Sequence, residues 1–200
     1  MQYAIFSDIH AYPPALMKVL AEVDARRVDQ TICLGDVVGL GPDPAGAVEL
    51  CQKLDICVSG NADQDYAATQ SNGLSDEQIL WLSRLPRIHF GNGFICTHKK
   101  FVIKNGEIVP GFGYLFRPED ADESLDAISD DAISEKFKIA FVGHTHEPCV
   151  WERDESEGTP SRCLAPERFI LQEGFRYVVN VGTVGYPRHS GCTSYVIYDD

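Results

Sequence analysis

The sequence lacks any apolar run near the roughly 18–20 residues that would span a bilayer. It also begins without a charged leader, because Met1-Gln2 runs directly into the strand-like segment YAIFS, unlike the start of a secretory signal. These two absences argue against a transmembrane helix and against secretion. They predict a cytoplasmic protein.

Positive charge is scarce. The chain has 17 Lys and Arg residues against 30 Asp and Glu residues, a formal net charge of −13. Binding to nucleic acid or to an anionic membrane depends on clustered Lys and Arg, so we expect neither as a general partner. The acidic surplus fits a protein that concentrates cations, but solubility alone explains most of these acids.

The seven cysteines are odd in number and contain no C-x-x-C pair, which argues against a disulfide framework. Cys33 and Cys96 lie within apolar, strand-like runs. We therefore expect reduced thiols, most of them buried, in a reducing compartment.

A chain of 200 residues with 44% hydrophobic and 24% charged residues is typical of one folded domain, which we expect to span residues 1–200. In its first half, apolar strand patterns at 3–7, 31–35 and 56–60 alternate with helical patterns after Pro13-Pro14 and at 44–54. This alternation predicts a parallel sheet, and the nearly continuous apolar strands predict that both of its faces are covered.

The second half follows a different pattern. A capping box, Ser75-x-x-Gln78, predicts a helix to about Arg84, and Gly91-Asn92-Gly93 predicts a hairpin between two strands. Residues 119–135 predict an acidic, solvated helix, and 151–162 a polar turn or loop. Further strands are expected at 138–143 and near 147–151, 168–172, 176–182 and 193–198. This half is therefore expected to be mainly antiparallel and to form a second sheet packed on the first.

Polar side chains follow the predicted strands, at the carboxyl ends where an open α/β sheet binds its ligand. Four of the six histidines are among them, and the set is Asp8, His10, Asp36, Asn61, His98, His144 and His146. Residues i and i+2 of an extended segment point to the same side, so Asp8 with His10, and His144 with His146, are each expected to present two ligands to one point.

These oxygen and nitrogen ligands, without an obvious thiolate, favour Mn²⁺, Fe or Zn²⁺. Seven groups exceed the needs of one tetrahedral ion. Two ions about 3.5–4 Å apart that share a carboxylate would use all seven, and such pairs support in-line attack at phosphorus.

The order of these motifs resembles the calcineurin-like metallophosphoesterase superfamily over essentially the whole chain. It is most similar to small bacterial-type phosphoesterases related to diadenosine tetraphosphatases, through LGDVVGLGPDP (34–44), VSGNAD (58–63), VGHTHEP (142–148) and VNVGTVGYPR (179–188). The resemblance implies an α/β (α+β) fold, a four-layer αββα sandwich of two mixed β-sheets flanked by helices. It assigns one metal to Asp8, His10, Asp36 and His146, and the other to Asp36, Asn61, His98 and His144.

The implied activity is hydrolysis of a small phosphate ester, as a phosphodiesterase or phosphatase, by attack of a metal-bridging hydroxide. The implied cofactors are two divalent metal ions, of which Mn is expected, with Fe, Zn, Ni or Mg as alternatives. Asn61 and His98 are candidate catalytic residues. Asp63 and Arg188 are further candidates. Asp63 either orients neighbouring groups or caps a helix or turn, and the same two roles are open for Asp65. Arg188 either contacts a phosphate or forms a structural ion pair.

Two positions depart from the family. Ala62 replaces the usual His that follows the Asn, and a methyl group cannot protonate a leaving group. Since general acid catalysis is commonly worth about 10²–10⁴ in rate, we expect a preference for phosphodiesters, phosphoanhydrides or activated aryl esters over alkyl monoesters. Lys99-Lys100 replaces a usual Gly, and these lysines either meet a phosphate or form a solvated turn.

Three other functions stay open. A dinucleoside polyphosphate hydrolase and a protein Ser/Thr phosphatase would use the same motifs, and fold analogy does not separate them. A metal-binding scaffold that has lost turnover is an alternative from another class, which the retention of all seven ligands opposes.

Overall fold

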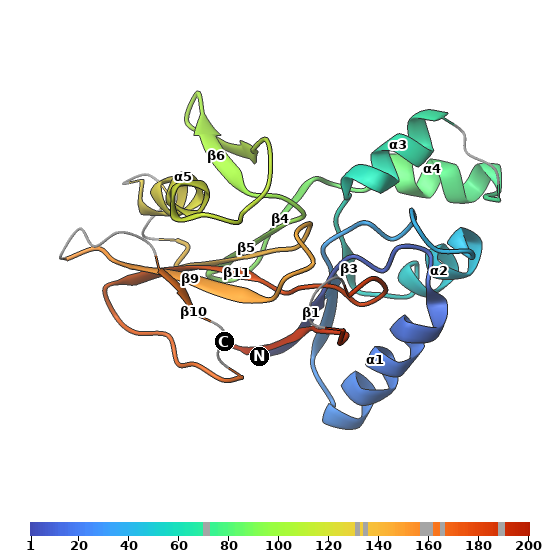
Figure 1. Cartoon of the computed structure of the whole chain (residues 1–200), viewed down its shortest axis with the longest axis horizontal. Helices are drawn as coiled ribbons and strands as arrows, with labels where there is room; N and C mark the ends of the chain where they lie inside the picture. The colour runs from blue at the N-terminus through green and yellow to red at the C-terminus, as the bar shows by residue number, and fades with distance from the viewer. Residues whose placement is uncertain (70–72, 131–132, 134–135, 157–161, 165–166, 188–190) are drawn as a thin grey trace.

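The computed structural model describes residues 1–69, 73–130, 133, 136–156, 162–164, 167–187 and 191–200 (Figure 1). Its first sheet has the order β12-β1-β2-β3. The strands β1 (Gln2–Phe6), β2 (Gln30–Cys33) and β3 (Ile56–Cys57) are parallel, as predicted, and β12 (Val196–Asp199) pairs antiparallel with β1. The two ends of the chain therefore lie side by side.

Two helices connect the parallel strands. They are α1 (Pro13–Arg26) and α2 (Pro44–Cys51), and each starts with proline, whose missing N–H costs nothing at that position. Their apolar residues pack on one face of the first sheet, among them Leu16, Val19 and Val48. In Figure 1 both helices lie on the same side of the sheet.

The second sheet has the order β10-β9-β11-β8-β5-β4. Its strands are β4 (Ile88–Phe90), β5 (Phe94–Thr97), β8 (Ile139–Val142), β9 (Cys149–Asp154), β10 (Arg162–Leu164) and β11 (Phe175–Asn180). The central strands β5, β8 and β11 are parallel, and only the pairs towards the edges are antiparallel. The expectation of a mainly antiparallel second half is therefore wrong for its centre.

The helix α5 (Pro118–Ser129) explains this difference. It supplies the crossover between β5 and β8 that parallel neighbours require. It is not the solvated helix that its acidic composition predicts, because one face is buried against the second sheet through Ala121, Leu125 and Ile128. Its carboxylates lie on the remaining face.

Several further elements differ from the sequence predictions. The hairpin of β6 (Phe101–Lys104) and β7 (Glu107–Pro110) and the helix α3 (Asn61–Thr69) were not anticipated, whereas α4 (Asp76–Arg84) forms with its capping box. The loop expected at 151–162 is shorter than predicted, since β9 continues to Asp154. Residues 168–172 form no strand in the described part of the chain.

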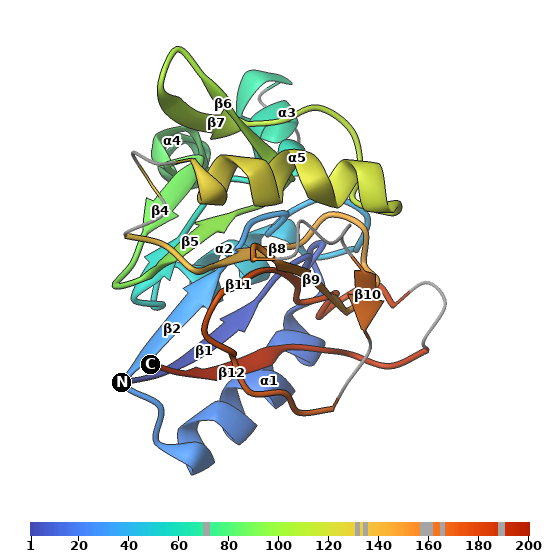
Figure 2. The ribbon, with the colours of Figure 1, turned by 90° about the vertical axis from the view of Figure 1, so that its left-hand side faces the viewer.

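The layers form an αββα sandwich, which confirms the predicted fold class. Between the sheets, Tyr3 and Ile5 of the first pack against Phe94, Phe141 and Tyr177 of the second. Figure 2 shows α5 over the outer face of the second sheet and α1 beneath the first. Among the described residues, no helix is long and apolar enough to cross a membrane.

Candidate metal centre

The candidate ligands lie in sharp turns at the carboxyl ends of the strands. Five of them have the left-handed backbone conformation that non-glycine residues rarely adopt, with φ of 56° at Asp8, 50° at His10, 49° at Asp36, 70° at His144 and 65° at His146. Such strain concentrates at functional sites, where the surrounding fold holds it. The expectation that these residues lie in extended segments is therefore wrong.

One group of donor atoms is formed by Asp8, His10 and His146, and all three residues are buried. The Nε2 atom of His146 lies 3.0 Å from Oδ1 of Asp8 and 2.9 Å from Nε2 of His10. The Nε2 atom of His10 lies 3.6 Å from the same Asp8 oxygen. Three donor atoms from two distant parts of the chain thus face one point.

A second group is formed by Asp36, His98 and His144. His144 and His146 therefore belong to different groups, so the expectation that this pair faces one point is wrong. The Oδ2 atom of Asp36 lies 3.3 Å from Nε2 of His98 and 3.7 Å from Nε2 of His10. This carboxylate stands between the two groups.

Backbone N–H groups orient both carboxylates. The N–H of His144 donates to Oδ2 of Asp8 at 2.9 Å, and the N–H of Ala62 donates to Oδ1 of Asp36 at 2.8 Å. Each carboxylate thereby turns its other oxygen towards the histidines. The bond from His144 to Asp8 also connects the second donor group to the first.

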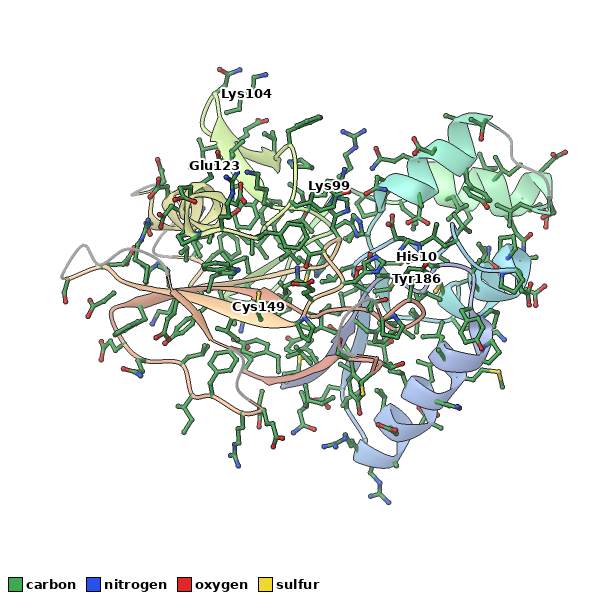
Figure 3. All side chains as sticks on the ribbon, viewed as in Figure 1. His10, Lys99, Lys104, Glu123, Cys149 and Tyr186 are labelled. Carbon is green, nitrogen blue, oxygen red and sulfur yellow. The ribbon has the colours of Figure 1, made fainter. Side chains whose placement is uncertain are left out.

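Backbone carbonyls orient two of the imidazoles. Nδ1 of His98 lies 3.0 Å from the carbonyl oxygen of Leu34, and Nδ1 of His146 lies 2.8 Å from that of Tyr186. A proton on Nδ1 that donates to the carbonyl leaves the Nε2 lone pair free for a metal. In Figure 3, His10 and Tyr186 lie next to each other at this site, and their ring centroids are 6.2 Å apart.

The donor set fits divalent cations. Among the described residues, Oδ1 of Asp8, Oδ1 of Asn61 and Nε2 of His98 are buried without a hydrogen-bond partner. Buried polar atoms normally have a partner, because leaving them without one costs free energy. Cations at the two groups would satisfy the Asp8 and His98 atoms, and Asn61 lines the cavity over those groups.

The charges of the site reinforce one another. Burial opposes ionisation of Asp8, but the nearby His98, His10 and His146 outweigh it and hold the pKa of Asp8 well below its usual range. Burial likewise opposes the charge on His98, yet the Asp36 and Asp8 carboxylates raise its pKa to about 9. Burial and the neighbouring His98 lower the pKa of His144 to about 3, so this imidazole stays neutral.

Asp63 binds backbone rather than facing the donor groups. Its Oδ1 accepts from the N–H of Val38 at 3.1 Å and its Oδ2 from the N–H of Gly60 at 2.8 Å. Burial and the charge of Asp36 raise the pKa of this carboxyl to about 7. Asp63 thus ties the loop after β2 to Gly60, the residue before α3, and both the orienting and the capping interpretation are consistent with these contacts. Asp65 is exposed.

The other candidates divide by position. Lys100 is buried and pairs with Asp120 at 3.1 Å and Glu123 at 2.9 Å on α5, so only Lys99 remains near the centre. Arg188 lies outside the described residues. Of the cysteines, Cys33, Cys51 and Cys96 are free and buried, as expected, whereas Cys192 is exposed.

Sequence reasoning missed several supporting groups. The side chain of Asn180 donates to the carbonyl of Gly143 and to Oγ1 of Thr145, both at 2.8 Å, and the hydroxyl of Thr183 donates to the Asp8 carbonyl at 2.8 Å. The segment VNVGTVGYPR, which carried part of the family resemblance, contains Asn180 and Thr183. That segment was the available signal, but no pattern indicated what it would contact.

Two glycines permit the close packing of these loops. A Cβ atom at Gly60 would collide with the Asp36 carboxylate, and one at Gly143 would collide with Ser7 and crowd the Asp8 carboxylate. Both positions therefore need glycine for space.

Comparisons with known proteins agree with this geometry. The model of the calcineurin-like phosphoesterase superfamily domain matches residues 1–199. The chain belongs to this superfamily. It is accordingly a phosphoric ester hydrolase, and the family implies divalent metal ions at a site such as the one described.

Individual relatives extend the comparison. An uncharacterized protein of Methanocaldococcus jannaschii, MJ0912, is 30% identical over 208 residues, which cover 98% of this chain and 82% of that protein. The crystal structure of a metallophosphoesterase from Sphaerobacter thermophilus is 28% identical, with a TM-score of 0.79 over 99% of this chain and 83% of that one. The E. coli phosphoesterase Yfce, 22% identical with a TM-score of 0.54 over 100% of this chain and 89% of its own, shares the fold.

Proposed function

We propose that this chain is a dinuclear metal-dependent phosphoesterase that hydrolyses phosphodiester, phosphoanhydride or activated phosphate ester bonds. The observation that supports this most is the Asp36 carboxylate, whose Oδ2 lies between the two donor groups at 3.3 Å from His98 and 3.7 Å from His10. One carboxylate shared by two groups of ligands favours a pair of ions over a single one. Mn is the metal we expect.

Two divalent cations bound there would lower the pKa of a water molecule and offset negative charge on the phosphoryl oxygens. The chain's own residues prepare the site for this. Asp8 and Asp36 stay ionised beside the histidines, and the backbone bonds from His144 and Ala62 keep their free oxygens in place. The site is thus organised before substrate binds, so little reorganisation accompanies the reaction.

Asn61 is placed for two tasks. Its buried Oδ1 has no hydrogen-bond partner in the described structure and is free to ligate, while its amide N–H groups can donate to a phosphate oxygen. The side chain lines a cavity of about 260 Å³ together with His10, Asp36, His144 and His146. A phosphate in this cavity would contact Asn61 and the donor groups at once.

Ala62 lines the same cavity and offers no proton. Asp63, which follows it, is engaged with two backbone N–H groups. Leaving groups that depart as stable anions are therefore favoured, and alkyl monoesters should be poor substrates. This supports the expected preference for diesters, anhydrides and aryl esters.

Hydrolysis of bis(p-nitrophenyl) phosphate tests the proposal. The protein with Mn²⁺ should release p-nitrophenolate, dialysis against a chelator should remove the activity, and added Mn²⁺ should restore it. A protein that binds two equivalents of Mn²⁺ and turns over neither this diester nor an anhydride would instead be the metal-binding scaffold. Turnover that survives complete removal of metal would contradict the metal-dependent mechanism.

A further inference from the structure

A second cavity, of about 240 Å³, opens beside the metal centre. His98 and Asn61 line it on the side of the donor groups. Asn61 also lines the cavity over the centre, so the two cavities meet at this side chain. A substrate whose scissile phosphate lies at the donor groups therefore has room to extend past Asn61.

The charge of this second cavity is unusual for the chain. Its described lining contains Arg87 and Lys99 and no Asp or Glu, although the net charge of the protein is −13. Within the described residues, neither of these cations makes a salt bridge, whereas the adjacent Lys100 is neutralised by two acids of α5. The lining thus retains positive charge next to a phosphate-binding centre.

One of the two cations is held in position. Nη2 of Arg87 donates to Oε1 of Gln64 at 2.9 Å, and Gln64 lies on α3, the helix that begins with Asn61. A guanidinium has five N–H donors in a planar fork that matches phosphate oxygens, so several remain for a ligand. In Figure 3, Lys99 lies between the β6–β7 hairpin and α3, whereas Lys104 stands at the far end of the hairpin.

We propose that Arg87, Lys99 and Asn61 form a subsite for a second phosphoryl group, so that the preferred substrates are phosphoanhydrides. This inference rests on the proposed function, because it places the scissile phosphate at the metal centre. The oxygen of a water molecule bonds to the scissile phosphorus, and the bond from that phosphorus to the bridging oxygen breaks. The electron pair leaves with the distal phosphate, and the water proton passes to solvent.

The subsite complements Ala62. The leaving group of an anhydride is a phosphate, whose charge Arg87 and Lys99 stabilise as it develops. Such a leaving group needs no proton donor at position 62. Ala62 and the two cations, Arg87 and Lys99, thus favour the same class of substrate, the phosphoanhydrides.

Binding to the Mn²⁺-loaded protein tests this by calorimetry with two non-hydrolysable probes. Methylenediphosphonate carries two phosphoryl groups and methylphosphonate carries one. Lys99→Gln and Arg87→Gln should each weaken methylenediphosphonate binding about tenfold, as expected for a charge-assisted contact, and change methylphosphonate binding less than twofold. Lys99→Arg should keep most of the affinity. The matched controls Lys104→Gln, on the hairpin tip, and Arg84→Gln, exposed on α4, should leave both ligands unaffected.

Kinetics provide the second readout. The kcat/KM for ADP should fall about tenfold in Lys99→Gln and Arg87→Gln, while that for bis(p-nitrophenyl) phosphate stays within twofold. Equal losses for both probes, or no loss for either, would overturn the subsite. A wild-type protein that hydrolyses neither bis(p-nitrophenyl) phosphate nor ADP with Mn²⁺ would refute the proposed function instead, and the binding of methylenediphosphonate would still decide the subsite.

Discussion

The two donor groups of the centre are built differently. Asp8, His10 and His146 are all buried, with side chains no more than 7% exposed. In the other group, His144 is only partly buried, and the ring of Tyr114 stacks on it with centroids 4.3 Å apart and planes 6° apart. Both groups reach the cavity over the centre, through His10 and His146 of the first group and His144 of the second. We call the first group enclosed and the second open, because only the second, through His98, also lines the cavity that contains the two cations. The comparison teaches that both groups face the cavity over the centre, and that only the open group also borders the cavity proposed for a second phosphoryl group.

The largest effect should come from Asp36, whose Oδ2 atom lies between the two groups. Asp36→Asn replaces the carboxylate between the groups with a neutral amide. We expect both groups to lose their metal, so that the enclosed and open groups no longer differ in metal binding. Turnover of bis(p-nitrophenyl) phosphate should fall at least about 10³-fold, and bound Mn²⁺, measured by atomic emission, should fall well below one equivalent. Asp24→Asn, an exposed change of the same chemistry on α1, is the control. A variant that kept two metals and full turnover would rule out the bridging assignment.

The second largest effect concerns Ala62, which lines the cavity over the centre and is not a metal ligand. Ala62→His places a proton donor in the cavity over the centre, and turnover of an alkyl phosphate monoester should rise about 10²-fold. Anhydride and aryl ester turnover should change little, because their leaving groups need no proton. Parallel assays with p-nitrophenyl phosphate and an alkyl phosphate measure the ratio. The control Ala62→Gln adds bulk without a proton donor. An equal change in turnover on every substrate in Ala62→His would contradict the role of Ala62 in substrate preference.

Asp63 supports the open group through the loop of Asn61. Asp63→Asn keeps the size of the side chain but removes one acceptor, so one of the N–H groups of Val38 and Gly60 loses its bond. Leaving a buried donor unpaired costs about 1–3 kcal/mol, which corresponds to a drop in Tm of about 2–12 °C for a chain of this size. Calorimetry on metal-free protein measures it. The exposed Asp65→Asn should shift Tm by less than about 2 °C, and an unchanged Tm in Asp63→Asn would refute the supporting role.

The smallest effect compares two tyrosines. Tyr114 stacks on His144 of the open group, whereas Tyr186 supports His146 of the enclosed group through its backbone carbonyl. Tyr114→Ala should weaken the affinity of the open group for Mn²⁺ about three- to tenfold, at the lower end of what residues that orient a metal ligand contribute. Tyr186→Ala should have less effect because its carbonyl remains, and Tyr114→Phe should resemble the wild type. Competition with a fluorescent chelator measures the Mn²⁺ affinity of each variant. Equal losses of affinity in Tyr114→Ala and Tyr186→Ala would remove the distinction between the groups.

Much of the fold followed from local patterns in the sequence. The strands and helices of the first half were predictable because each is a short apolar or amphipathic run with its own start signal, such as Pro13. The second sheet was harder. A buried central strand such as β8 has no alternation that reveals its direction, and α5 hides a narrow buried face within an acidic composition.

Residue type and spacing predicted the ligands individually, but only the family resemblance predicted their grouping. Residue type and position after a strand identified Asp8, Asp36 and His98. The division of His144 from His146 depended on left-handed turns with φ of 70° and 65°, which non-glycine residues adopt only where tertiary contacts impose them. The assumption of extended backbone consequently failed at the site itself.

By itself, the sequence determined the supply of donor atoms, their position at strand ends and the missing proton donor at Ala62, because these are properties of residue type and local order. The family resemblance assigned Asp36 to both metals, but only the tertiary structure placed its Oδ2 atom between the two groups and brought Arg87, from a different loop, beside Lys99 and Asn61. Those arrangements bring together residues far apart in the chain. Their proximity arises from the packing of the two sheets and from backbone strain that only the assembled loops can sustain.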